Sequence, residues 1–493
     1  MMAIGYDVVV VGAGNAGLTA AIAAREAGKS VLLVEAAAKS ERGGNSRWAS
    51  GVFRISHNGL DDIRRLVGED AGIPWDRVEA QPYPVERFYS DLIKSTGGQV
   101  DQGLLRQVIE RSSELATWLK EHGVKWSLSS SKFMNVENME PGQKIPLPPG
   151  GELIIDGNGV HLVEQLFSVA ENLGIDIRYD TQAMSLVSEG LSVVGVELAT
   201  NSGFETVGAT SVVLASGSFE ASAEARLRYL GPGWDLVKVR GTRHNTGRML
   251  DEAMRIGALS AGHWSGVHSV AIDADSPDFG DLELGDQNAR YSYPYGITVN
   301  VRGERFLDEG EDEMNFTYAE VGKKLLTQPK VLGFQLFDEQ TVSLLEPRYQ
   351  TGTPFVADTI EGLAELSGIS PAGLSATVNA FNAACSEGEF KPYAKDGLSS
   401  APPLQPPKSN WALRLDSPPF YAYKVTCGIT FAFAGLGIDR QSRVLSVAGH
   451  PMPGLYACGE IAGGIISHNL PGGSGLTKGG VTALFAADSV STI

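Results

Sequence analysis

Cysteine is scarce in this chain of 493 residues. The three cysteines, Cys385, Cys427 and Cys458, are odd in number, lie far apart and form no CxxC pair. Disulfide frameworks and zinc or iron–sulfur sites need paired or closely spaced cysteines. The sequence therefore argues against all of these, predicts no metal site, and fits a reducing compartment.

Positive charge is also in short supply. Lysine and arginine number 40 against 58 aspartates and glutamates, which gives a formal net charge of -18. Nucleic acids and anionic membranes attract positively charged surfaces. The composition therefore disfavours both as partners, although a local basic pocket can still hold a small anionic ligand.

A long uninterrupted hydrophobic run is missing as well. The apolar stretch over residues 6–24 has no basic residue before it, and Asp7 and Asn15 interrupt it. A membrane-spanning helix needs about 20 predominantly apolar residues, and a signal peptide needs a positively charged start. We therefore expect a cytoplasmic protein without membrane insertion.

The same stretch has the pattern of a strand–helix–strand unit. Residues 6–11 are valine-rich, residues 16–27 are rich in alanine, leucine and isoleucine, and residues 30–35 are apolar again. A short β-branched run is typical of a strand buried on both faces of a parallel sheet, and the alanine-rich segment ends at Gly28 as a helix would. The pattern predicts a βαβ unit at the start of an α/β domain.

The glycines of this unit form a dinucleotide fingerprint. Gly12, Gly14 and Gly17 spell GxGxxG directly after the first strand. The first glycine permits a tight turn, the second lets the backbone approach a pyrophosphate, and the third lets helix and strand pack closely. Glu35, at the end of the second strand, can accept hydrogen bonds from a ribose. Asn15 and Ala16 lie at the helix mouth, where the dipole favours phosphate.

FAD and NAD share this fingerprint, so further segments must distinguish them. A glycine pair follows the second strand, a VVLASG strand ends near residue 217, and GLYACGE ends another near residue 460. The additional residues that we predict to bind the cofactor are Gly43, Gly44, Asn45, Ser46, Ala183, Ala215, Ser216, Gly217, Gly459, Glu460, Ser474, Gly475 and Leu476.

Together these motifs resemble the fumarate reductase/succinate dehydrogenase flavoprotein superfamily over nearly the whole chain. The resemblance implies an α/β fold in which a glutathione-reductase-type, Rossmann-like FAD-binding domain carries an inserted α+β capping domain. It places the first part of the FAD domain at residues 1–261, the cap at 262–421 and the second part at 422–493. Some members attach FAD to a histidine just after the glycine-rich loop. Residues 43–51 contain no histidine, so we expect noncovalent FAD.

The segments that grip substrate in fumarate reductases have different contents here. Residues 305–309 keep an RFxxE frame, but residues 310–318 lack the arginine that donates the proton in those enzymes. Thr430 and Phe431 occupy positions of histidines, and residues 467–473 lack a carboxylate-binding arginine. The sequence therefore predicts that the chain does not reduce fumarate by the usual arrangement.

Within the superfamily the chain is most similar to the FAD-dependent tricarballylate dehydrogenase group. The matching segments are RGTRHNTG (240–247), WSGVH (264–268), DEGEDEMNFTYA (308–319), VTCGITF (425–431) and PGGSGLT (471–477). The resemblance implies oxidation, or in reverse reduction, of a carbon–carbon bond beside a carboxylate or carbonyl in a small organic acid. Where that group tends to carry a basic residue, this chain has Met314.

Such chemistry needs a hydride acceptor, a base and donors that stabilise a developing enolate. We predict Tyr318 as the base if nearby positive charge lowers its pKa, and Arg243 as the carboxylate anchor. His268 and His468 are candidates for binding a carboxylate or polarising a carbonyl. For each of these residues the alternative is a packed or solvated side chain without a catalytic role. Lys478 is a candidate for the neighbourhood of the flavin ring.

Two other functions are open at this stage. Apolar Phe431, Phe433 and Leu470 favour a 3-ketosteroid Δ1-dehydrogenase-like or cyclic-ketone desaturase. A flavin electron-transfer subunit that needs an iron–sulfur partner is the third possibility, because this chain supplies no cluster ligands. An electron-transfer partner or O2 is the expected acceptor, and the direction of the reaction is open.

Overall fold

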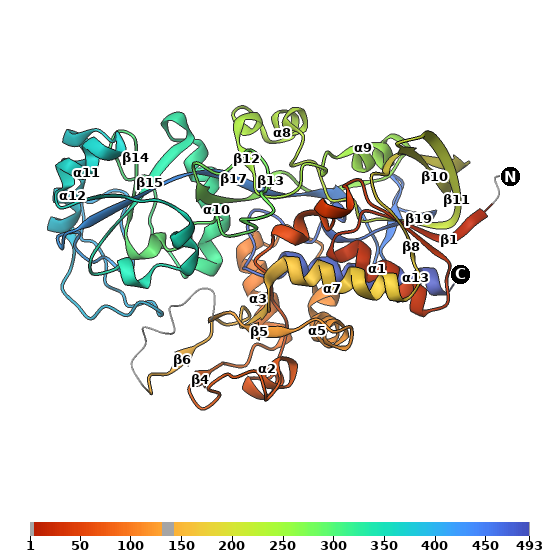
Figure 1. The fold of residues 1–493 in the computed structure, drawn as a ribbon, viewed down its shortest axis with the longest axis horizontal. Helices are drawn as coiled ribbons and strands as arrows, with labels where there is room; N and C mark the ends of the chain where they lie inside the picture. The colour runs from red at the N-terminus through yellow and green to blue at the C-terminus, as the bar shows by residue number, and fades with distance from the viewer. Residues whose placement is uncertain (1–3, 131–141, 493) are drawn as a thin grey trace.

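A computed structural model describes residues 4–130 and 142–492 (Figure 1). Its centre is a parallel sheet in the order β19–β11–β1–β2–β8. The strands are β1 (Ile4–Val11), β2 (Val31–Val34), β8 (Asp176–Arg178), β11 (Gly203–Leu214) and β19 (Pro451–Ala457). Residues 8–11 and 31–34 are at most 4% exposed, as their apolar sequence predicts for strands covered on both faces.

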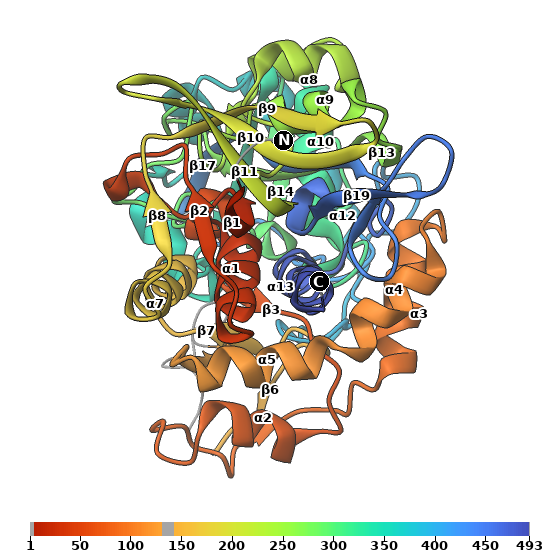
Figure 2. The ribbon, with the colours of Figure 1, turned by 90° about the vertical axis from the view of Figure 1, so that its right-hand side faces the viewer.

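Three helices cover one face of this sheet (Figure 2). They are α1 (Asn15–Glu26), α7 (Asn158–Asn172) and α13 (Ser474–Ser491), and α1 packs against the other two. On the opposite side, β9 (Gln182–Glu189) and β10 (Ser192–Thr200) form an antiparallel ribbon with β11. The short strand β18 (Arg443–Leu445) pairs with β19 at the sheet edge. The predicted βαβ unit is confirmed.

A mainly helical region lies beside the parallel-sheet layer (Figure 1). Three successive helices run over residues 85–121, because Gly97, Gly98 and the break at Arg111 interrupt the helical path. The elements of this region are α2 (Leu60–Val67), α3 (Val85–Thr96), α4 (Gln102–Glu110), α5 (Ser112–Glu121), β3 (Val52–Phe53), β4 (Val78–Glu79), β5 (Trp126–Leu128), β6 (Ile145–Pro146) and β7 (Leu153–Ile155).

A second, six-stranded sheet forms the other half of the molecule. Its strands are β12 (Lys238–Val239), β13 (Ser260–Asp273), β14 (Ile297–Asn300), β15 (Leu332–Asp338), β16 (Phe355–Ala357) and β17 (Phe420–Leu436). The helices around this sheet are α10 (Met314–Leu326), α11 (Ile360–Ser367) and α12 (Pro371–Ala384), while α8 (Ala223–Leu230) packs against β13 and α9 (Arg248–Arg255) packs mainly on β9 of the first half. A separate apolar core under this sheet includes Leu336, Leu363 and Phe381. This second α+β unit confirms the predicted fold class.

The long strands β13 and β17 join the two halves. They pair antiparallel from Ser260 opposite Leu436 to Asp273 opposite Val425, and β17 runs along the molecule from one half into the other (Figure 1). The predicted divisions at 261/262 and 421/422 fall inside these two strands, and the division of the chain into domains stays a prediction. No helix in the described part of the chain is both long and apolar enough to cross a membrane.

Candidate active site

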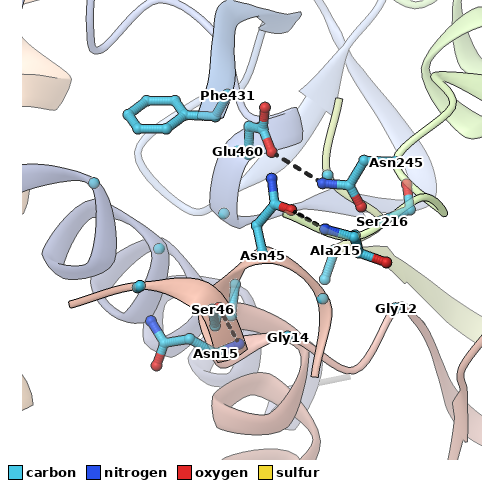
Figure 3. A pocket seen from close by; sticks show the side chains of 18 of the residues that line it. Gly12, Gly14, Asn15, Asn45, Ser46, Ala215, Ser216, Asn245, Phe431 and Glu460 are labelled. Carbon is cyan, nitrogen blue, oxygen red and sulfur yellow. Dashed lines mark hydrogen bonds between the residues drawn. The ribbon is translucent and has the colours of Figure 1, made fainter. Parts of the chain in front are cut away.

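One elongated pocket lies where the parallel strands end (Figure 3). Its empty volume is about 1650 Å³, including the part open to solvent. Residues at the carboxyl ends of β1, β2, β11 and β19 line one part, and residues from β13, α10 and β17 line another. This edge of an open α/β sheet is where ligands bind in such folds.

The three glycines of the fingerprint have three different environments. Gly12 has φ +98°, and a Cβ there would lie 2.6 Å from the Ala215 carbonyl oxygen. A Cβ on Gly17 would lie 1.8 Å from the Gly12 carbonyl oxygen, so this glycine permits the close packing of α1 on the turn. Gly14 is different, because its Cβ would meet nothing closer than the Ser46 Oγ at 3.4 Å. Only at Gly14 does the protein leave open space beside the backbone, which a ligand can use.

The amino terminus of α1 has the features of an anion-binding site. Gly14 is the N-cap and no side chain caps the helix, while the Asn15 N–H donates to the Ser46 Oγ at 2.9 Å. The Asn15 Oδ1 is buried and has no hydrogen-bond partner among the described residues. Uncapped N–H groups and the helix dipole favour a phosphate here.

Glu35 lies at the end of β2, also on the pocket. Its carboxylate accepts hydrogen bonds from the Ala13 N–H at 3.0 Å and the Ala37 N–H at 2.9 Å. Burial raises the pKa of this carboxyl, which the backbone donors partly offset. The position fits the ribose contact predicted from the sequence.

Most of the residues predicted to bind the cofactor line the pocket. They are Gly12, Gly14, Asn15, Ala16, Glu35, Gly44, Asn45, Ser46, Ala183, Ala215, Ser216, Gly217, Gly459, Glu460, Gly475 and Leu476. Gly17, Gly43 and Ser474 lie behind the lining. A Cβ on Gly43 would lie 2.9 Å from Val163 on α7, and the Ser474 Oγ donates to the Pro471 carbonyl at the start of α13. Open glycine backbone, an uncapped helix and a ribose-binding acid together fit an adenine dinucleotide.

The other part of the pocket has aromatic walls. His268 on β13 lies opposite Phe431 on β17, and the two rings stack at 4.9 Å with 13° between their planes. The Tyr318 ring on α10 lies 5.0 Å from His268, edge to face, and 5.0 Å from the Tyr291 ring. No described residue hydrogen-bonds either tyrosine hydroxyl, while both side chains line the pocket.

His268 and Tyr318 in this aromatic part are neutral near pH 7. Burial, with a smaller contribution from Arg240, lowers the pKa of His268 to about 3, and its Nδ1 has no partner among the described residues. Burial raises the pKa of Tyr318 above its ordinary value, which outweighs the opposite effects of Arg240 and Arg54. The nearby positive charge that we expected to activate Tyr318 is present, but it does not overcome desolvation.

Arg240, which sequence reasoning passed over, is the cation at the aromatic walls. Its backbone N–H donates to the Ile429 carbonyl on β17, its side chain lines the pocket, and the residue is only 5% exposed. Among the described residues it has no ion-pair partner, and its Nε has no hydrogen-bond acceptor. The RGTRHNTG segment could have indicated Arg240, because it contains two arginines three residues apart and either could bind a carboxylate.

Two predicted catalytic residues lie elsewhere. Arg243 is exposed, outside the pocket lining, with its guanidinium 5.6 Å from the Phe279 ring centre. His468 is also exposed and outside the lining; its ring lies 4.5 Å from His263 and its Nε2 bonds Gln99 at 2.9 Å. Tyr318 and His268 are the two of the four that the fold brings together.

A family model described as "FAD binding domain" matches residues 7–476. The chain belongs to the FAD binding domain family. This membership confirms FAD as the cofactor and the flavoprotein nature that the motifs predicted.

Relatives of this flavoprotein match almost its full length. It is 27% identical to the probable fumarate reductase Ifc3 of Shewanella frigidimarina, over 98% of this chain and 74% of the relative. The structure of a flavocytochrome c3 fumarate reductase in an open conformation is 26% identical, with a TM-score of 0.71 over 99% of this chain and 78% of that one. A 3-ketosteroid Δ1-dehydrogenase from Sterolibacterium denitrificans shares the fold, with 20% identity and a TM-score of 0.75 over 99% of both chains.

These similarities confirm two further predictions. The flavoprotein is a member of the fumarate reductase/succinate dehydrogenase flavoprotein superfamily, and it is an FAD-dependent oxidoreductase acting on carbon–carbon bonds. Membership of the tricarballylate dehydrogenase group, the substrate and the catalytic roles of single residues go beyond these similarities.

The open space at Gly14 leads to a first prediction. Gly14→Ala keeps the fold, because the new Cβ fits within the free protein, but it fills space that the pyrophosphate needs. We expect the free energy of unfolding of the FAD-free protein to change by less than about 0.5 kcal/mol. Overpacking should weaken FAD binding by about 1 to 3 kcal/mol, or roughly 5- to 150-fold. Titration of the FAD-free protein with FAD, followed by flavin fluorescence, measures this.

Gly17→Ala is the contrasting variant, because its Cβ would overlap the Gly12 carbonyl oxygen. It should lower the unfolding temperature even without FAD. Equal FAD affinity of Gly14→Ala and the unaltered protein would contradict our placement of the pyrophosphate.

Proposed function

We propose that this flavoprotein interconverts a small carboxylic acid and its α,β-unsaturated counterpart, by moving a hydride to or from FAD. The observation that carries the proposal is the buried, unpaired guanidinium of Arg240 among the aromatic walls. A buried cation without an acid partner is costly, and a substrate carboxylate would supply that partner. Arginine can hold a carboxylate through two parallel hydrogen bonds, which fixes orientation as well as position.

In this arrangement Arg240 takes the anchoring role that the sequence suggested for Arg243. Bound FAD supplies the hydride acceptor. With its carboxylate on Arg240, the substrate would present its carbon chain to Phe431 and Tyr318, whose rings exclude water. Charge that develops on the carboxylate beside the reacting carbon would stay paired with the guanidinium.

Tyr318 carries the proton. Its hydroxyl is protonated near neutral pH and has no hydrogen-bond partner among the described residues, and the side chain lines the pocket, so it can donate to the carbon beside the carboxylate during reduction. In the reverse direction the same oxygen must accept that proton as a phenolate. His268 stays neutral and offers a ring nitrogen for a hydrogen bond to the substrate.

The raised pKa of Tyr318 predicts opposite pH profiles for the two directions. Dehydrogenation needs the phenolate, whose fraction rises about tenfold per pH unit below the pKa. We expect the rate of substrate-driven flavin reduction to climb from pH 7 to beyond pH 9 without levelling off. Reoxidation of reduced flavin by the unsaturated acid needs the phenol, so its rate should be almost constant over the same range. Anaerobic stopped-flow spectroscopy at each pH measures both; a plateau below pH 8 for dehydrogenation would assign the base to another group.

One experiment tests the function as a whole. The yellow protein is mixed anaerobically with saturated mono-, di- and tricarboxylates, and the photoreduced protein with their unsaturated counterparts. A true donor bleaches the flavin band and a true acceptor restores it. Failure of every carboxylate in both directions would overturn the proposal.

A second candidate function is dehydrogenation of a cyclic ketone. The rings of Tyr291 and Tyr318 lie 5.0 Å apart and their hydroxyls have no hydrogen-bond partner among the described residues, which suits a carbonyl oxygen, and Leu470 adds apolar lining. Cyclohexanones and 3-ketosteroids therefore belong in the same panel. Bleaching by ketones, undiminished when Arg240 is replaced, would favour this function.

FAD in this protein is noncovalent. Residues 43–51 contain no histidine, and His244, which lines the pocket, interacts electrostatically with Glu41 and Asp180. Acid precipitation should release all of the yellow colour into the supernatant. A yellow pellet would show a covalent bond.

The cellular location and the electron-transfer partner are part of the proposal. The three cysteines are free, which supports a cytoplasmic location. A separate electron-transfer protein would take electrons from the flavin or deliver them to it, and O2 would act only as an electron acceptor. The purified chain alone should complete the half-reaction with substrate, whereas a subunit that depends on an iron–sulfur partner would not.

A further inference from the structure

Two carboxyl groups lie together at the cofactor pocket. Glu220 follows β11 and is completely buried, while Glu460 belongs to the short helix η9 (Gly459–Ile461) and lines the pocket. Neither has an ion-pair partner within 4 Å among the described residues. Sequence reasoning gave Glu460 a cofactor contact and gave Glu220 no role.

Asparagine side chains connect these two carboxyl groups. The Asn45 Nδ2 and the Asn245 Nδ2 each donate to the Glu220 Oε1 at 2.6 Å. The Asn245 Nδ2 also lies 3.4 Å from the Glu460 Oε2 (Figure 3). The Ala432 N–H donates to the Glu460 Oε1 at 2.9 Å. The Glu220 Oε2 is buried without a hydrogen-bond partner among the described residues.

The charges around the pair do not neutralise it. Lys478 on α13 acts on Glu460 from a distance, its Nζ lying 3.5 Å from the Glu460 backbone carbonyl, and burial lowers its own pKa to about 8. Arg226 on α8 binds the Glu220 backbone carbonyl at 2.6 Å rather than the carboxylate. The thiol of Cys458 is the remaining titratable group near Lys478, and burial raises its pKa to about 12, so it is uncharged.

Two carboxyl groups this close, one buried at Glu220 and one partly buried at Glu460, cannot both ionise without a large free-energy cost. Burial raises the pKa of Glu220, and burial together with the charge of Glu220 raises that of Glu460 well above its ordinary value. Such pairs hold one proton between them and titrate as a unit. The unpaired Glu220 Oε2 is an oxygen on which that proton can reside.

We propose that Glu220 and Glu460 form a proton-sharing pair that holds one proton while bound FAD is oxidised and takes up a second one when FAD is reduced. The hydride brings two electrons and one proton to the flavin and leaves it with one more negative charge. A proton from solvent, entering through the pocket that Glu460 lines, binds the ionised carboxylate of the pair and compensates that charge. Glu220 is thus a positioning residue that acts through Glu460, and this role is independent of which substrate delivers the hydride.

The test is the pH dependence of the midpoint potential of bound FAD, measured with reference dyes in the unaltered holoenzyme and in Glu220→Gln. The unaltered protein should take up two protons per two electrons over part of the range from pH 5.5 to 9. Glu220→Gln, which keeps the Oε1 acceptor but cannot ionise, should take up one. Glu152→Gln is the matched control, because Glu152 is equally buried but pairs with His57 away from the pocket, and it should behave like the unaltered protein.

Equal proton uptake in Glu220→Gln and the unaltered protein would overturn the proposal. If Glu220→Gln loses FAD, an infrared difference spectrum of the unaltered holoenzyme decides the question without a variant. Reduction should then increase the absorption of protonated carboxyl groups and decrease that of carboxylate. A spectrum without this change would also overturn the proposal.

Discussion

Tyr318→Phe should slow flavin reduction by the bound substrate about 10²- to 10⁴-fold, the range that a positioned proton-transfer group contributes. The ring stays, so its contacts with His268 and Tyr291 and the substrate affinity should change little. Only the oxygen that exchanges a proton with the reacting carbon is lost. Rapid mixing without oxygen separates the two effects, because the limiting rate falls while the half-saturating substrate concentration is nearly constant.

Tyr293→Phe provides the control for that experiment. Tyr293 is more deeply buried than Tyr318, but its hydroxyl bonds Thr317 and the residue does not line the pocket. Its variant should reduce flavin within a few-fold of the normal rate. A normal rate in Tyr318→Phe would move the proton-transfer role to another group, and Tyr291→Phe would be the next variant to measure.

Arg240→Leu should lower kcat/KM for a carboxylate by about two to three orders of magnitude. Removing one partner of a buried, hydrogen-bonded charge pair costs about 2 to 5 kcal/mol, and 1.36 kcal/mol corresponds to a tenfold change in rate. In the FAD-bound protein without substrate the same change removes a buried, unpaired cation. The free energy of unfolding should therefore stay the same or rise. Loss of activity together with retained or increased stability is the expected signature of a substrate anchor.

Arg243→Leu separates this result from a general effect of charge. Arg243 is exposed and three residues away, and its loss should leave kcat/KM within about twofold, because surface charges contribute little. Steady-state assays with carboxylate and ketone substrates, alongside thermal unfolding, cover both variants. If Arg243→Leu were the damaging change, the anchor would be the one that the sequence suggested.

The cofactor half of the site could be predicted from the sequence because its geometry is local. Gly12, Gly14 and Gly17 specify a turn and a helix start within six residues, and Glu35 closes the same βαβ unit. Backbone conformation and short-range packing determine such features, so the residue types alone carry the information. The parallel sheet followed for the same reason.

The substrate half depends on pairings between distant segments. Arg240 and Arg243 stand in one motif, and only the pairing of β12 with β17 decides which of them lines the pocket. His268 meets Phe431 because β13 has an irregularity between His263 and Val267 just before that position, which no periodicity reveals. Glu220 and Glu460 are 240 residues apart in the chain. No local pattern in the sequence could have connected them.

The ribbon of β13 and β17 limits how substrate enters. Eleven residue pairs form the ladder, which passes the reacting end of the pocket at His268 and Phe431. A rotation of one half of the molecule against the other would have to break these backbone hydrogen bonds. Gradual bending of the two paired strands keeps them intact. Bending of the six-stranded half would then move the rings of His268 and Phe431 together. The same movement would therefore let a substrate enter and align its carbon atoms.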